Sequence, residues 1–295
     1  LIPHAKAKAL VENFAGQWLT IRGLSGATPD PKKFPDFDVA LRSAMYRETE
    51  MFFEAILRED RSILDFLEAD FSFVNERLAK HYGIAGVKGN EFQRVKLPPE
   101  RGGILTQASI LTLTSNPTRT SPVKRGKWVM EQILGTPPPP PPPDVPELEE
   151  NPKELKGSLR QRLEQHRANA SCAVCHNKMD PLGIAFENFD AIGAWREKDS
   201  GFKIDPSGVL PDGKRFGGPR ELKLLLREKK DLFARCLSDK LLTYALGRGV
   251  EYYDKCAIDK IVQALDKNDY RFSTLIMETI RSEPFLMRTT MGRKE

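Results

Sequence analysis

Seven consecutive prolines, Pro137 to Pro143, constrain the fold of this chain more than any other feature. Proline has no backbone N–H and holds φ near −65°, so such a run can form neither a helix nor a central strand. We expect a polyproline II rod of roughly 20 Å, at about 3.1 Å per residue. The rod predicts a stiff strut that holds two helical modules at a fixed distance. Binding to a proline-recognising domain is the alternative use of such a run.

Helical signals dominate the sequence before the prolines. Residues 37–59 carry apolar side chains at helical spacing, with charged residues between them. Ser62 followed by Asp65 predicts a capping box, and Gly83 predicts a left-handed helix end. A further helix is expected from Ser121, as the N-cap, to just before Gly135.

The sequence after the prolines predicts helices around one small hairpin. A helix is expected from Ser158, a β-hairpin within residues 202–216, and three closing helices. The closing helices are expected over residues 231–246, 254–266 and 273–282. The predicted fold class is therefore mainly α, with helical modules joined by the polyproline strut. The expected divisions are an N-terminal helical module (1–100), a connecting helix region (101–136), the polyproline linker (137–150), a cysteine–histidine motif module (151–203) and a hairpin plus C-terminal helical module (204–295).

Charge and hydropathy exclude two classes of partner. The 46 basic and 41 acidic residues are interleaved, and the calculated pI of 8.9 reflects a mildly basic surface rather than a nucleic-acid interface. No run approaches ~20 apolar residues, so we expect no transmembrane segment. The chain starts at Leu1 rather than Met, and its start does not decide whether a signal peptide preceded it.

The segment SCAVCHNKMDPLG, residues 171–183, carries the candidate functional site. A c-type haem needs two thiols one helical turn apart for its thioether bonds, and a histidine directly after the second thiol as proximal iron ligand. Cys172, Cys175 and His176 supply all three. We therefore expect one covalently attached haem c.

Three other interpretations of the motif fit the residues less well. A zinc site needs four ligands, and the remaining cysteines, Cys236 and Cys256, do not form a second Cys-x-x-Cys pair. A redox dithiol normally follows a strand in a βαβ unit, whereas this motif follows an expected helix. Coincidence among structural cysteines is disfavoured because half of the four cysteines fall within four positions.

The sixth ligand of the iron has several candidates. His166 shares the apolar face of its expected helix with Leu159 and Leu163, where a histidine is more often a core residue, but it lies only ten residues before His176. Met287 is a weaker, long-range candidate. A vacant position is a further possibility.

Residues near the motif are candidates for the surroundings of a haem. Arg167, Lys178 and Arg196 could pair with the haem propionates, and Trp195 could wall the haem. The acidic residues around Trp195 are expected to be solvated, with a catalytic carboxylate pair as the alternative.

Cys236 and Cys256 lie in two neighbouring expected helices, twenty residues apart. A disulfide between them would stabilise the fold by about 3 kcal/mol in the chain-entropy model. Two free thiols are the alternative. Thioether attachment of haem belongs to oxidising compartments, which favours the disulfide.

The segment HRANASCAVCHNKMDPLGIAFENFDAIGAWRE resembles the core signature of large planctomycete-type secreted proteins that combine cytochrome c motifs with tandem helical domains of unknown function. Residues 112–150, 236–262, 11–24 and 56–84 are similar to the neighbouring modules of that family. The resemblance implies a haem-bearing protein with a periplasmic or otherwise extracytoplasmic location. It also implies a haem-site role for His166, as ligand or propionate partner, and supports the Cys236–Cys256 disulfide.

These expectations converge on an electron-transfer protein that exchanges electrons with a redox partner protein or with other subunits of a complex. A haem enzyme with an open distal site and a structural subunit that uses haem as a folding staple are the alternatives.

Overall fold

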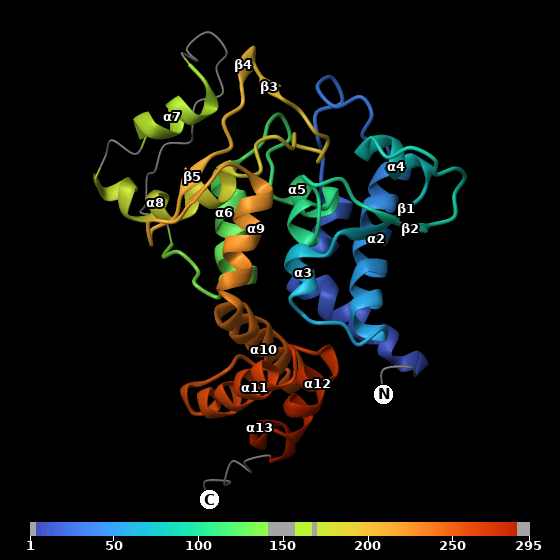
Figure 1. Ribbon diagram of the computed structural model, residues 1–295, viewed down its shortest axis with the longest axis vertical. Helices are drawn as coiled ribbons and strands as arrows, with labels where there is room; N and C mark the ends of the chain where they lie inside the picture. Colours follow the sequence, from blue (N-terminus) through green and yellow to red (C-terminus); the bar gives the residue numbers. More distant parts are fainter. Residues whose placement is uncertain (1–3, 141–156, 167–169, 288–295) are drawn as a thin grey trace, which may run out of the picture.

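The computed structural model describes residues 4–140, 157–166 and 170–287 (Figure 1). Its described part is mainly helical and contains three small antiparallel sheets of two strands each, which confirms the predicted fold class. None of the helices in these three ranges combines the length and the apolar character that a bilayer crossing requires.

The first third of the chain surrounds the long helix α2 (Val39–Arg58), which begins where Leu41 N donates to Asp38 Oδ1 at 2.6 Å. Helix α4 ends at Gly83 with φ 71°, as predicted. Strands β1 and β2 pair with Phe71 opposite Lys96. The other elements of this part are η1 (Ala5–Ala7), η2 (Leu10–Ala15), α1 (Gly16–Trp18), η3 (Ile21–Gly26), α3 (Asp65–Glu68), β1 (Phe71–Val74), α4 (Glu76–Tyr82) and β2 (Gln93–Lys96).

The rest of the chain is built of shorter helices and two small hairpins. Ser121 caps α6 and Gly135, with φ 63°, ends the η5 turn that continues α6, as predicted. The elements are η4 (Ile104–Thr106), α5 (Ala108–Leu113), α6 (Pro122–Val129), η5 (Met130–Leu134), α7 (Leu159–His166), α8 (Ala170–Ile184), β3 (Lys198–Asp199), β4 (Phe202–Lys203), β5 (Gly208–Val209), β6 (Arg215–Phe216), α9 (Pro219–Glu228), α10 (Lys230–Leu246), η6 (Tyr252–Asp254), α11 (Lys255–Lys267), α12 (Phe272–Arg281) and α13 (Glu283–Leu286).

Local differences from the sequence prediction have identifiable causes. The expected capping box at Ser62 does not start a long helix: Ser62 forms a β-bridge with Arg271, and α3 is only four residues long. Helix α9, which begins at Pro219, is not among the helices expected from the sequence. Pro137 to Pro140 lie outside helices and strands, while the remaining prolines of the run lie outside the described residues.

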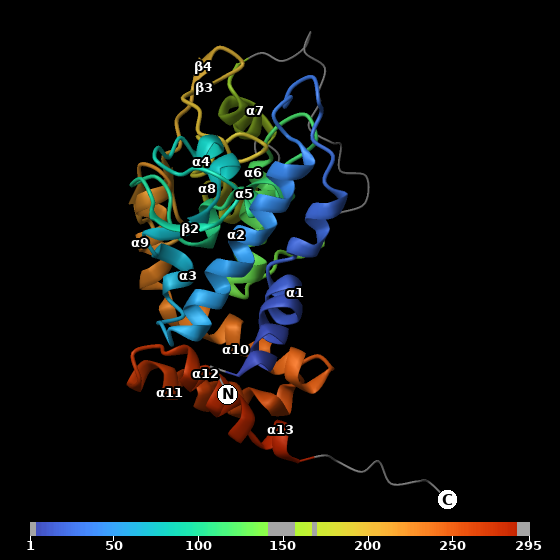
Figure 2. The ribbon, with the colours of Figure 1, turned by 90° about the vertical axis from the view of Figure 1, so that its right-hand side faces the viewer.

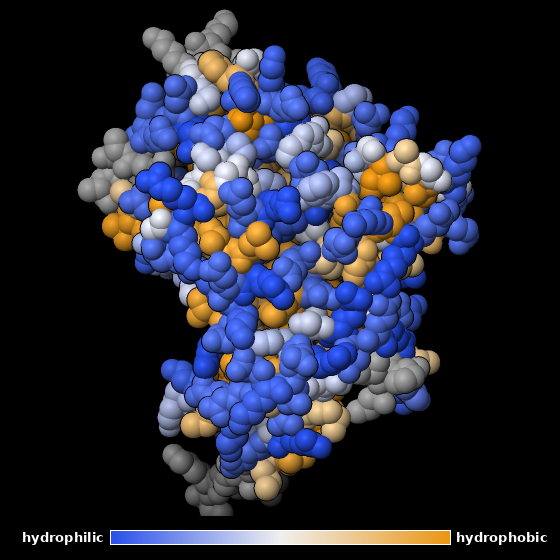
Figure 3. All heavy atoms as spheres, viewed as in Figure 1, coloured by the Kyte–Doolittle hydropathy of each residue, from blue (hydrophilic) through white to orange (hydrophobic). Residues whose placement is uncertain are grey.

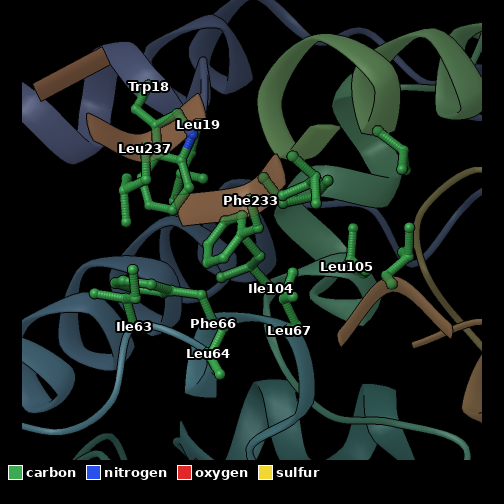
Figure 4. Close-up of a cluster of buried hydrophobic side chains, with 14 of the residues drawn as sticks. Trp18, Leu19, Ile63, Leu64, Phe66, Leu67, Ile104, Leu105, Phe233 and Leu237 are labelled. Carbon is green, nitrogen blue, oxygen red and sulfur yellow. The ribbon is translucent and has the colours of Figure 1, made fainter. Parts of the chain in front are cut away.

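One hydrophobic cluster joins segments from both sides of the prolines. It contains buried side chains from Val11 in η2 to Leu275 in α12. Figure 4 shows Trp18, Phe66 and Phe233 turned toward one another, and the Trp18 and Phe66 rings meet edge to face with centroids 5.1 Å apart. The parts of the chain before and after the prolines therefore pack directly against each other, and the C-terminal helices lie below the rest in Figures 1 and 2.

Candidate functional site

The cysteine–histidine motif lies entirely on helix α8. Cys172, Cys175 and His176 stand at positions i, i+3 and i+4, so they share one face of the helix. Cys175 is partly exposed as a free thiol, and the side chain of Cys172 lies outside the described residues. The motif therefore has the one-face arrangement that two thioether bonds and one axial imidazole require.

A buried carboxylate orients the imidazole of His176. Nδ1 of His176 lies 2.9 Å from Oδ1 of Asp180, one helical turn further along α8. Asp180 is 0% exposed, and the His176 side chain is 15% exposed. Histidines that bind metals commonly donate their second ring N–H to a carboxylate, which fixes the ring and its tautomer. With Nδ1 engaged in this way, Nε2 is the nitrogen that can face an iron.

Two glycines bring α8 into backbone contact with α6. A Cβ at Gly126 would lie 1.9 Å from the carbonyl oxygen of Met179, and a Cβ at Gly183 would lie 1.8 Å from that of Pro122. Only glycine allows so close an approach. The second half of α8 is thereby fixed to α6, whereas the first half reaches the surface, where Val174 is 67% exposed.

The turn after α8 is held by a buried ionic cluster. Arg125, on α6, donates to the carbonyl oxygens of Phe186 (2.6 Å), Phe189 (2.9 Å) and Asp190 (2.8 Å). Glu187 accepts from Arg125 Nη1 at 3.3 Å. Burial lowers the pKa of Arg125 to about 10. Burial also raises the pKa of Glu187, although the positive charges of Arg125 and Arg196 oppose that shift.

Three of the expected haem surroundings have other contacts or are exposed. Arg196 forms ion pairs with Glu187 (3.1 Å) and Asp199 (2.6 Å), so it belongs to the buried ionic cluster. Trp195 is 43% exposed and packs edge to face on Phe189, with centroids 5.2 Å apart. Lys178 is exposed on α8.

Helix α7 presents a guanidinium that sequence reasoning did not single out. Nε and Nη1 of Arg162 are buried and have no hydrogen-bond partner among the described residues. Burial, and then the charge of nearby Arg119, lower the pKa of Arg162. Arg162 and His166 are four residues apart, so they lie on the same side of α7. An orphaned guanidinium fits an anionic group such as a carboxylate.

The candidates for the sixth ligand are placed differently. His166 is the last residue of α7, and its side chain lies outside the described residues, as does Arg167. Met287 is 71% exposed at the end of α13, which packs on α10 and α12 at the far end of the molecule from α8 (Figures 1 and 2). The structure thus does not bring Met287 to α8.

The predicted Cys236–Cys256 disulfide is not present. Both residues are free thiols, Cys236 buried and Cys256 exposed. Helices α10 and α11 do pack together, but Sγ of Cys236 points to η5, 3.4 Å from the carbonyl oxygen of Gln132. Burial raises the pKa of Cys236 to about 11.

Asp180 is the site residue that sequence reasoning missed. An acidic residue four positions after His176 was visible in SCAVCHNKMDP, and the i,i+4 rule places it on the same helix face. Among the described residues, no three histidine, cysteine, aspartate or glutamate side chains gather as a metal-ligand group.

Together the fold and the site define a mainly α-helical chain in which an exposed Cys-x-x-Cys-His helix is anchored on a larger helical core. Three successive parts of the chain match families that are each described as a protein of unknown function. Residues 1–84 match DUF1592, residues 101–199 match DUF1588 and residues 212–285 match DUF1585. These matches establish tandem domains. No curated protein and no solved structure matches the chain.

Proposed function

We propose that this chain is an extracytoplasmic c-type cytochrome-like protein that carries one covalent haem and transfers electrons as a subunit or domain of a larger redox system. The observation that carries the proposal is the face of α8 on which Cys175 and His176 lie, with the His176 imidazole oriented by buried Asp180. Thioether attachment is made outside the cytoplasm, which gives the proposed location.

The residues of the chain have separate tasks in this proposal. Cys172 and Cys175 would hold the macrocycle covalently, and His176 would bind the iron through Nε2. Asp180 keeps the imidazole in one orientation, at 2.9 Å from Nδ1. The haem, when bound, supplies a one-electron couple at its iron. Arg162 is the candidate partner for a haem carboxylate, and His166 stays the candidate for the second axial position.

Electron transfer is favoured over a purely structural role by the exposure of the motif. Val174, between the two cysteines, is 67% exposed, so the edge of a haem attached there would be accessible to a partner protein. The α6–α8 backbone contact fixes the second half of α8, directly after His176, which limits reorganisation when the charge on the iron changes. Both features suit an exchange of electrons across a protein surface.

The decisive experiment is production of the chain in a periplasm with a c-type haem attachment system. We expect the intact mass to exceed the chain mass by one haem, and the reduced protein to show an α-band. A low-spin spectrum in both redox states supports electron transfer, whereas high-spin iron that binds cyanide would support a haem enzyme.

Matched cysteine variants control for nonspecific haem. Cys175→Ser should lose one thioether bond and shift the α-band. Cys256→Ser, which changes an exposed thiol outside α8, should leave the spectrum and the mass added by the haem unchanged. Absence of covalent haem from the unaltered chain would refute the proposal.

A further inference from the structure

A pocket of about 380 Å³ opens on another side of α8, between α7 and the β5–β6 hairpin. In Figure 1 strand β5 lies beside α8, and the two elements are in direct contact. Ile184 follows Cys175 by nine residues, which at about 100° per residue places it half a turn around the helix. The pocket is therefore distinct from the cysteine face. Its lining residues are Arg160, Pro181, Ile184, Ser207, Gly208, Val209, Arg215 and Phe216.

The floor of the pocket is apolar and closely packed. Phe216 and Ile184 are 3% and 4% exposed, and Pro181 is buried beside them. A Cβ at Gly208 would lie 2.4 Å from Cζ of Phe216, so the glycine leaves room for the phenyl ring. Val209, 44% exposed, adds an apolar rim. Figure 3 shows several hydrophobic patches among hydrophilic side chains on the face seen in Figure 1.

Two guanidinium groups border this floor. Arg160 is fixed in place, because its Nη2 donates to the carbonyl oxygens of Asp205 (2.9 Å) and Ser207, and its Nε lies 3.4 Å from Oδ2 of Asp205. Arg215 is exposed, and the described part of the chain gives its side chain neither an ion pair nor a hydrogen bond. One anchored and one unengaged cation thus face a common apolar surface.

We propose that this pocket binds a small carboxylate with an apolar body, of the aryl or short-chain alkyl class. A carboxylate matches the planar fork of a guanidinium and forms hydrogen bonds about twice as strong as neutral ones. The apolar body packs over the floor formed by Phe216 and Ile184 and covers exposed Val209, a contact that an inorganic anion cannot make. The pocket volume lies within the range of about 300–1,000 Å³ that is usual for ligand sites.

The test is a ¹⁹F NMR titration of the whole chain with 4-(trifluoromethyl)benzoate and its neutral amide at low ionic strength. We expect saturable binding of the benzoate and at least about tenfold weaker binding of the amide, because only the charged group engages both arginines. Equal affinities for the two probes, or no saturable shift with the benzoate, would overturn the proposal.

Variants locate the binding to this pocket. Arg215→Gln should weaken the benzoate about tenfold and leave the amide unchanged. Val209→Glu places a carboxylate at the rim and should abolish benzoate binding. Arg220→Gln changes an exposed arginine of α9 outside the lining and is the matched control. Equal loss of affinity in Arg215→Gln and Arg220→Gln would mean that surface charge, and not the pocket, attracts the probe. Far-UV circular dichroism verifies that each variant is folded.

Discussion

At the scale of single residues, the burial of Glu48 makes the stability of the fold depend on pH. Glu48 is 1% exposed on α2, where its carboxylate accepts from Ser72 Oγ (2.6 Å) and from Tyr82 OH (2.5 Å). Burial raises its pKa to about 7, against the opposing effect of these hydrogen bonds and of Arg101. The folded protein therefore holds a proton on Glu48 that the unfolded chain releases near pH 4.5.

We predict that Glu48→Gln removes a pH dependence of the free energy of unfolding. For a carboxyl whose pKa is raised on folding, the associated stability is fully present below about pH 4.5 and is lost as the pH rises to about 7. The loss should be on the order of 3 kcal/mol at about 1.4 kcal/mol per pKa unit. Urea unfolding at both ends of this window measures it. Glu91→Gln, an exposed control, should keep the slope, and an unchanged slope in Glu48→Gln would contradict the assignment.

A second prediction at this scale concerns Asp180 and rests on the proposed haem. Asp180→Asn should leave the haem attached through both cysteines and raise the midpoint reduction potential. The reason is that the buried negative charge beside His176, at 2.9 Å from Nδ1, favours the more positive oxidised iron. Equilibrium redox titration gives the potential. Asp259→Asn, which removes an exposed charge on α11, should change it little; equal potentials for both variants would show that Asp180 does not act on His176.

At the scale of helices and strands, local signals in the sequence predict the helix ends that are fixed by residues of the same turn. Gly83, Ser121 and Gly135 act within their own turns, so their residue types suffice to locate helix ends. The start of α12 is different. Its amide at Ser273 donates to Oδ1 of Asp60 at 2.7 Å, a carboxylate more than two hundred residues away in the sequence. Such a cap has no local signature: the helix expected from Ser273 begins at Phe272, and Ser273 is its second residue rather than its N-cap.

The candidate site also has a part that local sequence predicts and a part that depends on tertiary contacts. The cysteines and the histidine of the Cys-x-x-Cys-His motif follow from local spacing, and Asp180 follows from one turn of helix. The contact that holds α8 on α6 joins Gly126 to Met179 and Gly183 to Pro122, more than fifty positions apart. No periodic pattern in the sequence predicts it. Tertiary contact therefore explains the part of the site that sequence reasoning could not reach.

The α6–α8 contact gives a prediction for Gly126→Ala. The added methyl would meet the carbonyl oxygen of Met179 at 1.9 Å, so the helices must separate. We expect the free energy of unfolding to fall by about 3 kcal/mol or more, at the upper end for overpacked cores. Urea unfolding is the measurement. Gly249→Ala adds the same methyl where nothing lies within 4 Å and should be near neutral. Similar stabilities for the two variants would refute the close contact.

At the scale of the whole molecule, the N-terminal and C-terminal parts are joined by backbone pairing as well as by the shared core. Ile63 N donates to Tyr270 O at 2.8 Å, and Phe272 N donates to Arg61 O at 3.0 Å. The Phe272 ring is 0% exposed and meets Phe53 edge to face at 5.6 Å. The tandem domains therefore share the hydrophobic cluster that runs from Val11 to Leu275, while a second cluster is built from residues between Leu24 and Ala108 alone.

Phe272→Ala tests whether the tandem domains unfold as one unit. Removing a fully buried ring should lower the free energy of unfolding by about 3–5 kcal/mol. Because Phe272 packs on N-terminal rings, we expect tryptophan fluorescence and far-UV circular dichroism to report one coincident transition in the variant, at lower urea. Phe285→Ala, at a side chain 42% exposed on α13, should barely shift it. Two separate transitions in Phe272→Ala, with the C-terminal helices lost first, would show that the domains are stable independently and that their contact is a docking surface rather than a common core.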